Sequence, residues 1–150
     1  MRSYSFRVYV RWKQRISLSN WVKARTRAFA ILVDDPDALP VTGSVFVHFA
    51  IVNLPPNLRA LVQNQDFTVF SNAQLLRNDF GTIGWSGPCP PVEDCAHEYR
   101  FTIYALCSKL TIDKPDIKLT VEVFERNFNK CVIAKAQFGA FYRLTFGTRK

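Results

Sequence analysis

Residues 85–101 read WSGPCPPVEDCAHEYRF, and the rest of the chain is organised around this stretch. It contains a Gly-Pro-Cys-Pro-Pro run at residues 87–91. Proline lacks a backbone donor and fixes φ, and it pushes the preceding residue into extended geometry. We therefore predict a stiff loop over residues 86–91. The loop leads into His97 and then into an apolar strand over residues 100–107, a scaffold on which binding sites are commonly built.

The composition is that of a packed globular protein. The chain has 150 residues, of which 48% are hydrophobic, and 13 phenylalanines. This is enough for a single domain over residues 1–150 with a substantial core. No apolar run approaches the roughly 18 residues of a membrane-spanning helix, and no secretory signal is visible, so we expect a cytoplasmic protein.

The four cysteines do not follow a metal-binding pattern. They lie at positions 89, 95, 107 and 131, without the paired spacing of a zinc ribbon. In a reducing compartment such residues stay reduced, so we expect four free thiols.

The net charge of +8 is concentrated near the N-terminus. Residues 1–27 contain eight basic residues and no acidic one, whereas residues 28–150 contain twelve of each. A basic segment can bind nucleic acid or an anionic membrane surface. No stacking motif or helix-turn-helix pattern accompanies the charge, so we expect no dedicated nucleic-acid role.

Apolar patterns predict a chain rich in strands. Residues 4–12 alternate between apolar and polar side chains, which predicts a strand with one wet face, and a second short strand is expected at residues 16–18. Residues 28–33 form a continuous apolar run that predicts a strand buried on both faces. Residues 44–53 are the strongest strand prediction, and residues 67–70 predict a short one.

The C-terminal segment allows two interpretations. Alternate apolar residues from Ile117 to Val123 favour a strand, but apolar residues of the range 117–132 also fall at helical spacing, and Asp116 could cap a helix. Residues 135–143 are typical of a short terminal helix or an extended tail.

Four ordered motifs carry a resemblance to a known family. They are Asp35-Pro36-Asp37 after the buried strand, a histidine at position 48, the GPCPP run at 87–91, and HEYRF at 97–101. Together they resemble the phosphatidylethanolamine-binding protein family, also called the Raf-kinase-inhibitor-like family, over roughly residues 26–143. The resemblance to its bacterial and archaeal branch implies a mainly β fold. That fold has a large central antiparallel sheet, a second smaller sheet and short C-terminal helices, which favours a helix over residues 117–132.

The resemblance also implies an anion-binding pocket. Its residues would be Asp35, Asp37, His48, Gly87, Pro88, His97 and Tyr99. Imidazoles and a loop amide can donate hydrogen bonds to phosphate, and an aspartate beside a histidine raises its pKa and fixes its tautomer. We therefore expect a binding protein rather than an enzyme. We expect this binding protein to hold phosphate or a phosphorylated head group, without a cofactor. Inhibition of a kinase is one role in the family, and the resemblance leaves a protein partner and a homodimer open.

Three alternatives assign the same chain another function. Cys89, His97 and Asp35 could act as a hydrolase triad, although the prolines around Cys89 disfavour an oxyanion hole. His48, His97 and Asp35 could bind zinc. In the third alternative the pocket is vestigial, and the basic N-terminal segment binds nucleic acid or a membrane.

Overall fold

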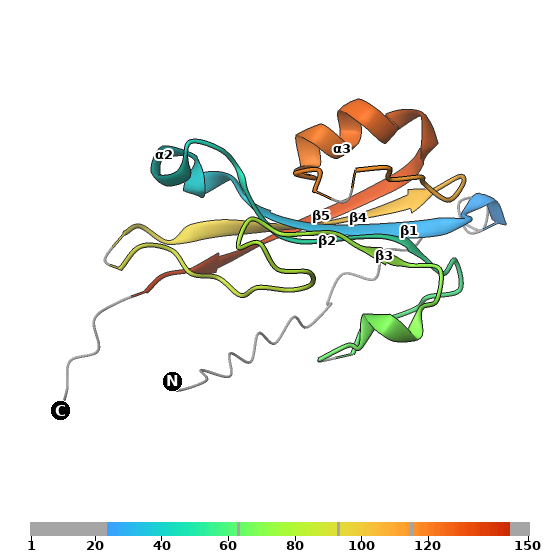
Figure 1. Cartoon of the computed structure of the whole chain (residues 1–150), viewed down its shortest axis with the longest axis horizontal. Coiled ribbons are helices and arrows are strands. Elements are labelled where there is room, and N and C mark those ends of the chain that lie inside the picture. Colours follow the sequence, from blue (N-terminus) through green and yellow to red (C-terminus); the bar gives the residue numbers. More distant parts are fainter. Residues whose placement is uncertain (1–23, 63, 93, 115, 145–150) are drawn as a thin grey trace.

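The protein is mainly β, as the sequence predicts. A computed structural model describes residues 24–144 apart from 63, 93 and 115, and these residues form a five-stranded antiparallel sheet in the order β3-β2-β1-β4-β5 (Figure 1). The strands are β1 (Ala28–Asp35), β2 (Phe46–Leu54), β3 (Gln74–Leu75), β4 (His97–Leu106) and β5 (Val132–Tyr142). The helical elements are η1 (Pro36–Ala38), α2 (Leu39–Thr42), η2 (Phe67–Val69), α3 (Val121–Phe128) and η3 (Asn129–Cys131).

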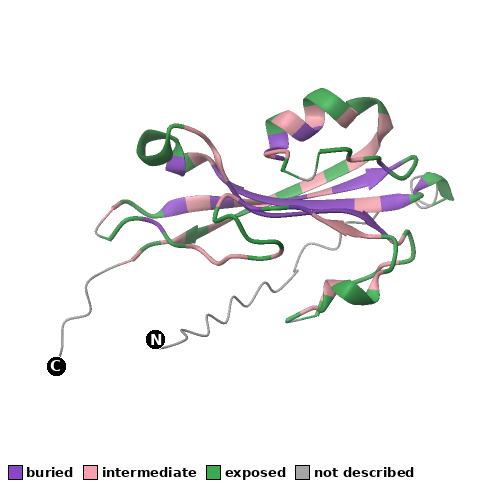
Figure 2. Ribbon diagram, in the orientation of Figure 1, coloured by how far each residue is buried: buried purple, intermediate pink, exposed green. Residues whose placement is uncertain are grey.

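The central strand is β1, whose sequence AFAILVDD is apolar up to its two terminal aspartates. It pairs with β2 on one side and with β4 on the other. Every residue of β1 except Phe29 is buried, as Figure 2 shows. The prediction of a strand buried on both faces at residues 28–33 is confirmed, because this strand has neighbours on both edges and a core on each face.

Two hydrophobic cores cover opposite faces of the sheet. On one face Leu32 packs with Tyr104 and with Phe124 of α3, and the Tyr104 and Phe124 rings stack with centroids 4.3 Å apart. On the other face Ile31 packs with Phe49, and the segment between β2 and β3 covers them. Figure 1 shows α3 and the η2 segment on opposite sides of the sheet. This division follows from the alternation of side chains along each strand.

The carboxylate of Asp34 joins three elements between the sheet and α3. Asp34 is fully buried and accepts two hydrogen bonds, each 2.8 Å long, from the guanidinium of Arg100 on β4. Its Oδ2 also accepts the amide of Val121, the first residue of α3, at 3.0 Å. Arg100 forms a second ion pair with Glu122 at 2.8 Å. A charged carboxylate is tolerated here because charged and backbone donors together satisfy its oxygens.

The C-terminal part of the chain combines a helix with a strand. α3 begins at Val121 because the Thr120 hydroxyl accepts the amide of Val123 at 3.2 Å and caps the helix. The helix predicted over residues 117–132 is therefore present but shorter. Residues 135–143 lie mostly in β5 rather than in a terminal helix. Their burial alternates along the strand, as expected for an edge strand with one wet face.

Other expectations from the sequence are corrected or lie outside the described residues. Residues 67–70 form the turn η2 rather than a strand, because the Asp66 side chain accepts the amide of Thr68 and caps a helical turn. The tight turn that we expect after residues 28–33 would expose Asp35, but this residue is buried. The strands expected at residues 4–12 and 16–18 lie outside the described residues. Within the described ranges all five strands belong to one sheet, so the second, smaller sheet is not among them.

The helices of the described residues are short. None of them is long and apolar enough to cross a membrane.

Replacing Asp34 with alanine should lower the free energy of unfolding by about 3 kcal/mol, because the Arg100 guanidinium and the Val121 amide lose their buried acceptor. Denaturant unfolding followed by circular dichroism measures this loss. Asp116 is the matched control, since its carboxylate pairs with Arg77 at the surface, 2.9 Å away. Asp116→Ala should cost less than about 1 kcal/mol. Equal losses in the two variants would contradict the structural role of Asp34.

Candidate functional site

The end of β1 and the start of β4 bring Asp35 and His97 together. Nδ1 of His97 lies 2.8 Å from Oδ2 of Asp35, and both side chains are almost completely buried. The other carboxylate oxygen of Asp35 accepts the amide of Ala38 at 3.1 Å, which holds the carboxylate in place. Because Asp35 can only accept when ionised, His97 carries a proton on Nδ1, and Nε2 is left for other partners.

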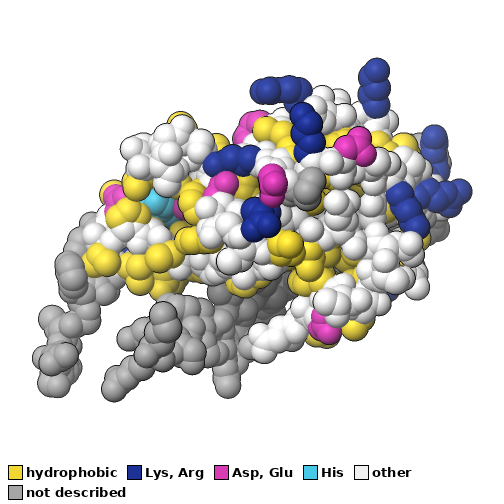
Figure 3. All heavy atoms as spheres, in the orientation of Figure 1, with side chains coloured by type: hydrophobic (Ala, Val, Ile, Leu, Met, Phe, Trp, Pro, Cys, Tyr) yellow, Lys and Arg dark blue, Asp and Glu magenta, His cyan; other side chains and the backbone are white. Residues whose placement is uncertain are grey.

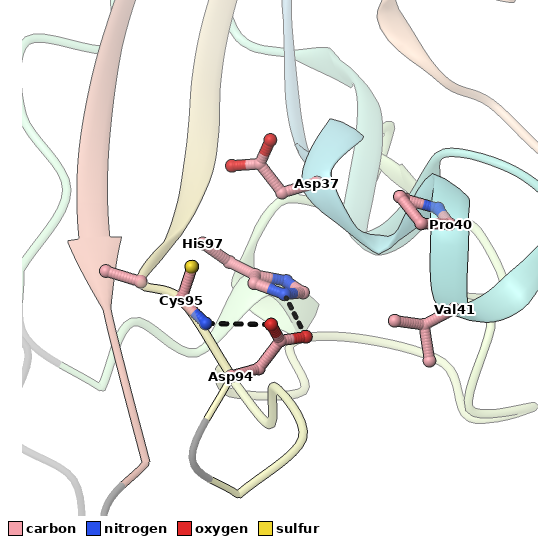
Figure 4. A pocket seen from close by; sticks show the side chains of 7 residues that line it. Asp37, Pro40, Val41, Asp94, Cys95 and His97 are labelled. Carbon is pink, nitrogen blue, oxygen red and sulfur yellow. Dashed lines mark hydrogen bonds and ion pairs between the residues drawn. The ribbon is translucent and has the colours of Figure 1, made fainter.

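His97 lines an open hollow with a volume of about 290 Å³. The other lining residues are Asp37, Pro40, Val41, Asp94, Cys95 and Ala96. Nε2 of His97 lies 3.5 Å from Oδ2 of Asp94, and Figure 4 shows the ring between this carboxylate and the Asp37 side chain. Asp37 also accepts the amide of Glu98 at 2.8 Å, so it holds the start of β4 against η1. The hollow therefore has an imidazole at its wall and two carboxylates beside it.

His48 joins the site through a bulge in β2. The register pairs Val33 of β1 with Phe49 and Asp34 with Val47, so His48 is the extra residue of β2. Val47 belongs to the core under α3 and Phe49 to the opposite core, although residues two apart share a face in a regular strand. A bulge of this kind redirects a side chain and is common beside binding sites.

The bulged histidine anchors the proline-rich loop. Nδ1 of His48 donates to the carbonyl of Ser86 at 2.9 Å, and the amide of Ser86 donates to the carbonyl of His48 at 3.2 Å. Burial lowers the pKa of His48, and the backbone of Gly87 lies close enough to oppose this shift. Pro88 follows in the loop and is half-buried. The loop thus stands against the His48 side of the site.

Tyr99 links the two histidines. It lies two residues after His97, on the same face of β4, and its ring packs edge-on against His48 with centroids 5.0 Å apart. Its hydroxyl is the one buried side-chain polar atom in the described part of the chain without a hydrogen-bond partner. A buried hydroxyl without a partner is uncommon in native proteins. The Asp35 carboxylate and the Cys89 backbone lie close enough to affect its pKa, but neither forms a hydrogen bond of normal geometry with it.

The two histidines have opposite pKa shifts. Burial lowers the pKa of His48, and the Ser86 carbonyl and the charge of Asp35 recover only part of the loss. Burial also acts to lower the pKa of His97, but the hydrogen bond and charge of Asp35, followed by Asp94, outweigh it and raise the pKa. Burial and then the charge of Asp35 raise the pKa of Tyr99, so its hydroxyl keeps its proton. The site therefore pairs a histidine that favours the cationic form with one that favours the neutral form.

Two alternative functions lack part of the geometry that they need among the described residues, although Asp35 and His97 themselves lie together. Cys89 is exposed, and its thiol makes no hydrogen bond to His97 or Asp35 in the described part of the chain. No three His, Cys, Asp or Glu side chains among the described residues are grouped closely enough to hold a metal ion. His48, His97 and Asp35 thus do not form the zinc ligand set that the sequence allows.

Sequence reasoning missed two residues of the site. Asp94 stands three positions before His97, and an acidic residue so close to a candidate histidine is a signal that could have identified it. Ser86 acts through its backbone carbonyl and amide, which no side-chain motif reveals.

Comparison with solved structures defines the class of protein. The crystal structure of Escherichia coli YbcL, described as a member of the PEBP family, matches with a TM-score of 0.65 and 32% identity, over 80% of this chain and 73% of YbcL. The structure of CT736 from Chlamydia trachomatis, a PEBP homologue, matches with a TM-score of 0.63 and 29% identity, over 79% of this chain and 73% of CT736. The fold is that of the PEBP-like β proteins.

Sequence comparison then gives the family. The family model for phosphatidylethanolamine-binding proteins matches residues 11–143. The UPF0098 protein YbcL of Escherichia coli is 36% identical over 124 residues, which is 79% of this chain and 65% of YbcL. The UPF0098 protein of Aquifex aeolicus is 36% identical over 84 residues, which is 54% of this chain and 46% of that protein. The chain belongs to the phosphatidylethanolamine-binding protein family, and it spans about half to two thirds of the length of these relatives.

An NMR titration of the two imidazole rings should show His97 titrating above the ordinary histidine pKa of about 6.5 and His48 below it. Asp35→Asn should lower the pKa of His97, because the imidazolium loses its carboxylate. The protonation of His97 contributes its full share to the free energy of unfolding below a pH of about 6.5. This contribution is lost as the pH rises through the pKa of His97 in the folded chain. Asp66→Asn, a change on the exposed η2 turn, should leave both rings unchanged. Titration of His97 below 6.5 in the unaltered chain would contradict the assignment.

Proposed function

We propose that the chain is a non-enzymatic binding protein that holds phosphate or a phosphorylated head group beside His97. The observation that carries this proposal is the Asp35–His97 pair, which lies 2.8 Å apart and favours the imidazolium. A charge-assisted donor at Nε2, fixed on the first residue of a strand, is suited to a phosphate oxygen. The name of the family supports a ligand of this class.

His48 and Tyr99 complete the proposed site. The Tyr99 hydroxyl keeps its proton and makes no hydrogen bond of normal geometry within the described residues, so a ligand oxygen can accept from it. His48 commits Nδ1 to Ser86, and in its neutral form it offers Nε2 as an acceptor for the hydroxyl of a phosphate monoanion. In this proposal Asp35, Gly87 and Pro88 position the imidazoles and the Tyr99 hydroxyl.

The carboxylates of the hollow favour a head group that also carries a positive charge. Asp37 and Asp94 both line the hollow with His97. On the face shown in Figure 3, the histidine surface lies among acidic and hydrophobic side chains, while most Lys and Arg side chains lie over other parts of the molecule. A bare phosphate dianion would be repelled by these carboxylates, whereas an ammonium group would pair with them. We therefore expect O-phosphorylethanolamine to bind more tightly than inorganic phosphate.

A regulatory role through a protein partner, of the kinase-inhibitor kind, is part of the proposal only through the family resemblance. In such a role, the affinity for the protein partner would depend on whether the hollow holds a ligand.

Titration with O-phosphorylethanolamine should shift the ring signals of both histidines at millimolar ligand. His97→Gln should weaken binding by about tenfold or more, because it removes a charge-assisted hydrogen bond. Binding should also weaken as the pH rises through the pKa of His97. Asp116→Asn serves as a surface control and should bind normally. If neither histidine of the unaltered chain responds at millimolar ligand, the proposed function is wrong.

A second variant tests the charge of the head group. Asp94→Asn should reduce the preference for O-phosphorylethanolamine over inorganic phosphate several-fold, because the ammonium loses a carboxylate partner and Nε2 of His97 loses a competitor. Isothermal titration calorimetry with the two compounds measures the ratio of affinities. An unchanged ratio would contradict the placement of the ammonium in the hollow and leave the phosphate contact in place.

A further inference from the structure

Cys107 and Cys131 face each other where β4 ends and β5 begins. Cys107 follows Leu106, the last residue of β4, and Cys131 precedes Val132, the first residue of β5. Leu106 pairs with Val132, and the amide of Cys107 donates to the carbonyl of Cys131 at 2.8 Å. The ladder therefore continues by one more pair. Directly opposed residues of an antiparallel ladder have Cα atoms about 4.5–5.5 Å apart, which is within the range that a disulfide bridges.

Several donors converge on the sulfur of Cys131. Its Sγ lies 3.0 Å from Sγ of Cys107, 3.2 Å from the amide nitrogen of Ser108 and 3.1 Å from the Ser108 hydroxyl. In the thiol form Cys131 can instead donate to the Ser108 carbonyl, 3.7 Å away. Hydrogen-bond donors around a partly exposed sulfur stabilise the thiolate, which is the reactive form of cysteine.

The protonation of the two thiols agrees with this geometry. Burial acts to raise the pKa of Cys131, but the hydrogen bonds from Cys107 and Ser108 outweigh it and lower the pKa. The hydrogen bond to Cys131, with a smaller effect of burial, raises the pKa of Cys107. Cys131 is therefore the thiol that ionises first, and Cys107 is its exposed neighbour.

We propose that Cys107 and Cys131 form a thiol–disulfide exchange site for low-molecular-weight disulfides. The Cys131 thiolate attacks one sulfur of the disulfide RSSR, which forms a mixed disulfide on Cys131 and releases RS⁻. Cys107 then loses its proton to water and attacks Sγ of Cys131, which forms the Cys107–Cys131 bond and releases the second RS⁻. Two protein thiols are oxidised, and one RSSR is reduced to two thiols. Before the exchange all four cysteines are free thiols, as the sequence predicts.

The Cys107–Cys131 disulfide would constrain the chain after the C-terminal end of α3, whereas Asp34 contacts its N-terminal end. The loop closed by Cys107 and Cys131 contains α3, whose first amide is already held by Asp34 at 3.0 Å. The exchange site and the proposed ligand site lie at opposite ends of β4, which has ten residues and is roughly 30 Å long. Each proposal can therefore fail without the other.

The experiment uses the full chain with Cys89→Ser and Cys95→Ser, so that only the proposed pair remains. The reduced protein is incubated with oxidised glutathione without oxygen, and the products are followed by intact mass and by peptide mapping. We expect the loss of two hydrogen atoms and a peptide cross-linked through Cys107 and Cys131. We also expect a rise of roughly 5–10 °C in the thermal midpoint, which dithiothreitol reverses. Absence of reaction, or glutathione adducts without the cross-link, would overturn the proposal.

Single variants in the same background test the order of the steps. Cys107→Ser should stop the reaction at a glutathione adduct on Cys131. Cys131→Ser should react several-fold more slowly at Cys107, which lacks the converging donors. Ser108→Ala removes one of these donors and should slow the first step several-fold. Equal rates of adduct formation in Cys107→Ser and Cys131→Ser would overturn the assignment of Cys131 as the attacking thiol.

Discussion

Two adjacent carboxylates at the end of β1 face opposite sides of the sheet, and the surrounding structure is arranged to satisfy both. Asp34 faces α3 and receives Arg100 and the first amide of the helix. Asp35 faces the opposite side and receives His97 and the amide of Ala38. Because side chains alternate along a strand, a shift of one residue would exchange the two carboxylates between the helix and the site. The register of β1 therefore fixes both the position of α3 and the charge of the site.

The site itself depends on departures from regular secondary structure. In a regular β2, Val47 would lie on the same face as Phe49, and His48 would point toward α3. The bulge opposite Asp34 reverses both directions. The proline-rich loop cannot join the ladder, so it meets β2 through two hydrogen bonds between Ser86 and His48, one from the His48 side chain and one from the Ser86 amide. These two irregularities place the histidine with the lowered pKa beside Tyr99, while the regular start of β4 supplies the one with the raised pKa.

The sequence predicts strands correctly where the chain has a long apolar run. It predicts the wrong element where a local polar contact determines the secondary structure. The runs at 28–33 and 44–53 identify β1 and β2 because a continuous apolar segment needs burial on both faces. Residues 67–70 have the composition of a strand, but the Asp66 cap turns them into η2. The motif resemblance predicts that Asp35, His48 and His97 share a pocket. It predicts a raised pKa for a histidine beside an aspartate, as found for His97 beside Asp35, but not the lowered pKa of His48, because that shift depends on burial.

The pairing of β1 with β4 has a consequence for how the chain reaches its native state. The Asp35–His97 and Asp34–Arg100 contacts join residues 62 and 66 positions apart, and the Asp34–Val121 contact spans 87. A hairpin of β1 and β2 can close early, but it carries two neighbouring carboxylates without the basic partners that β4 supplies. Closing loops over such separations is slow. The two carboxylates therefore gain Arg100 and His97 as partners only when β4 docks.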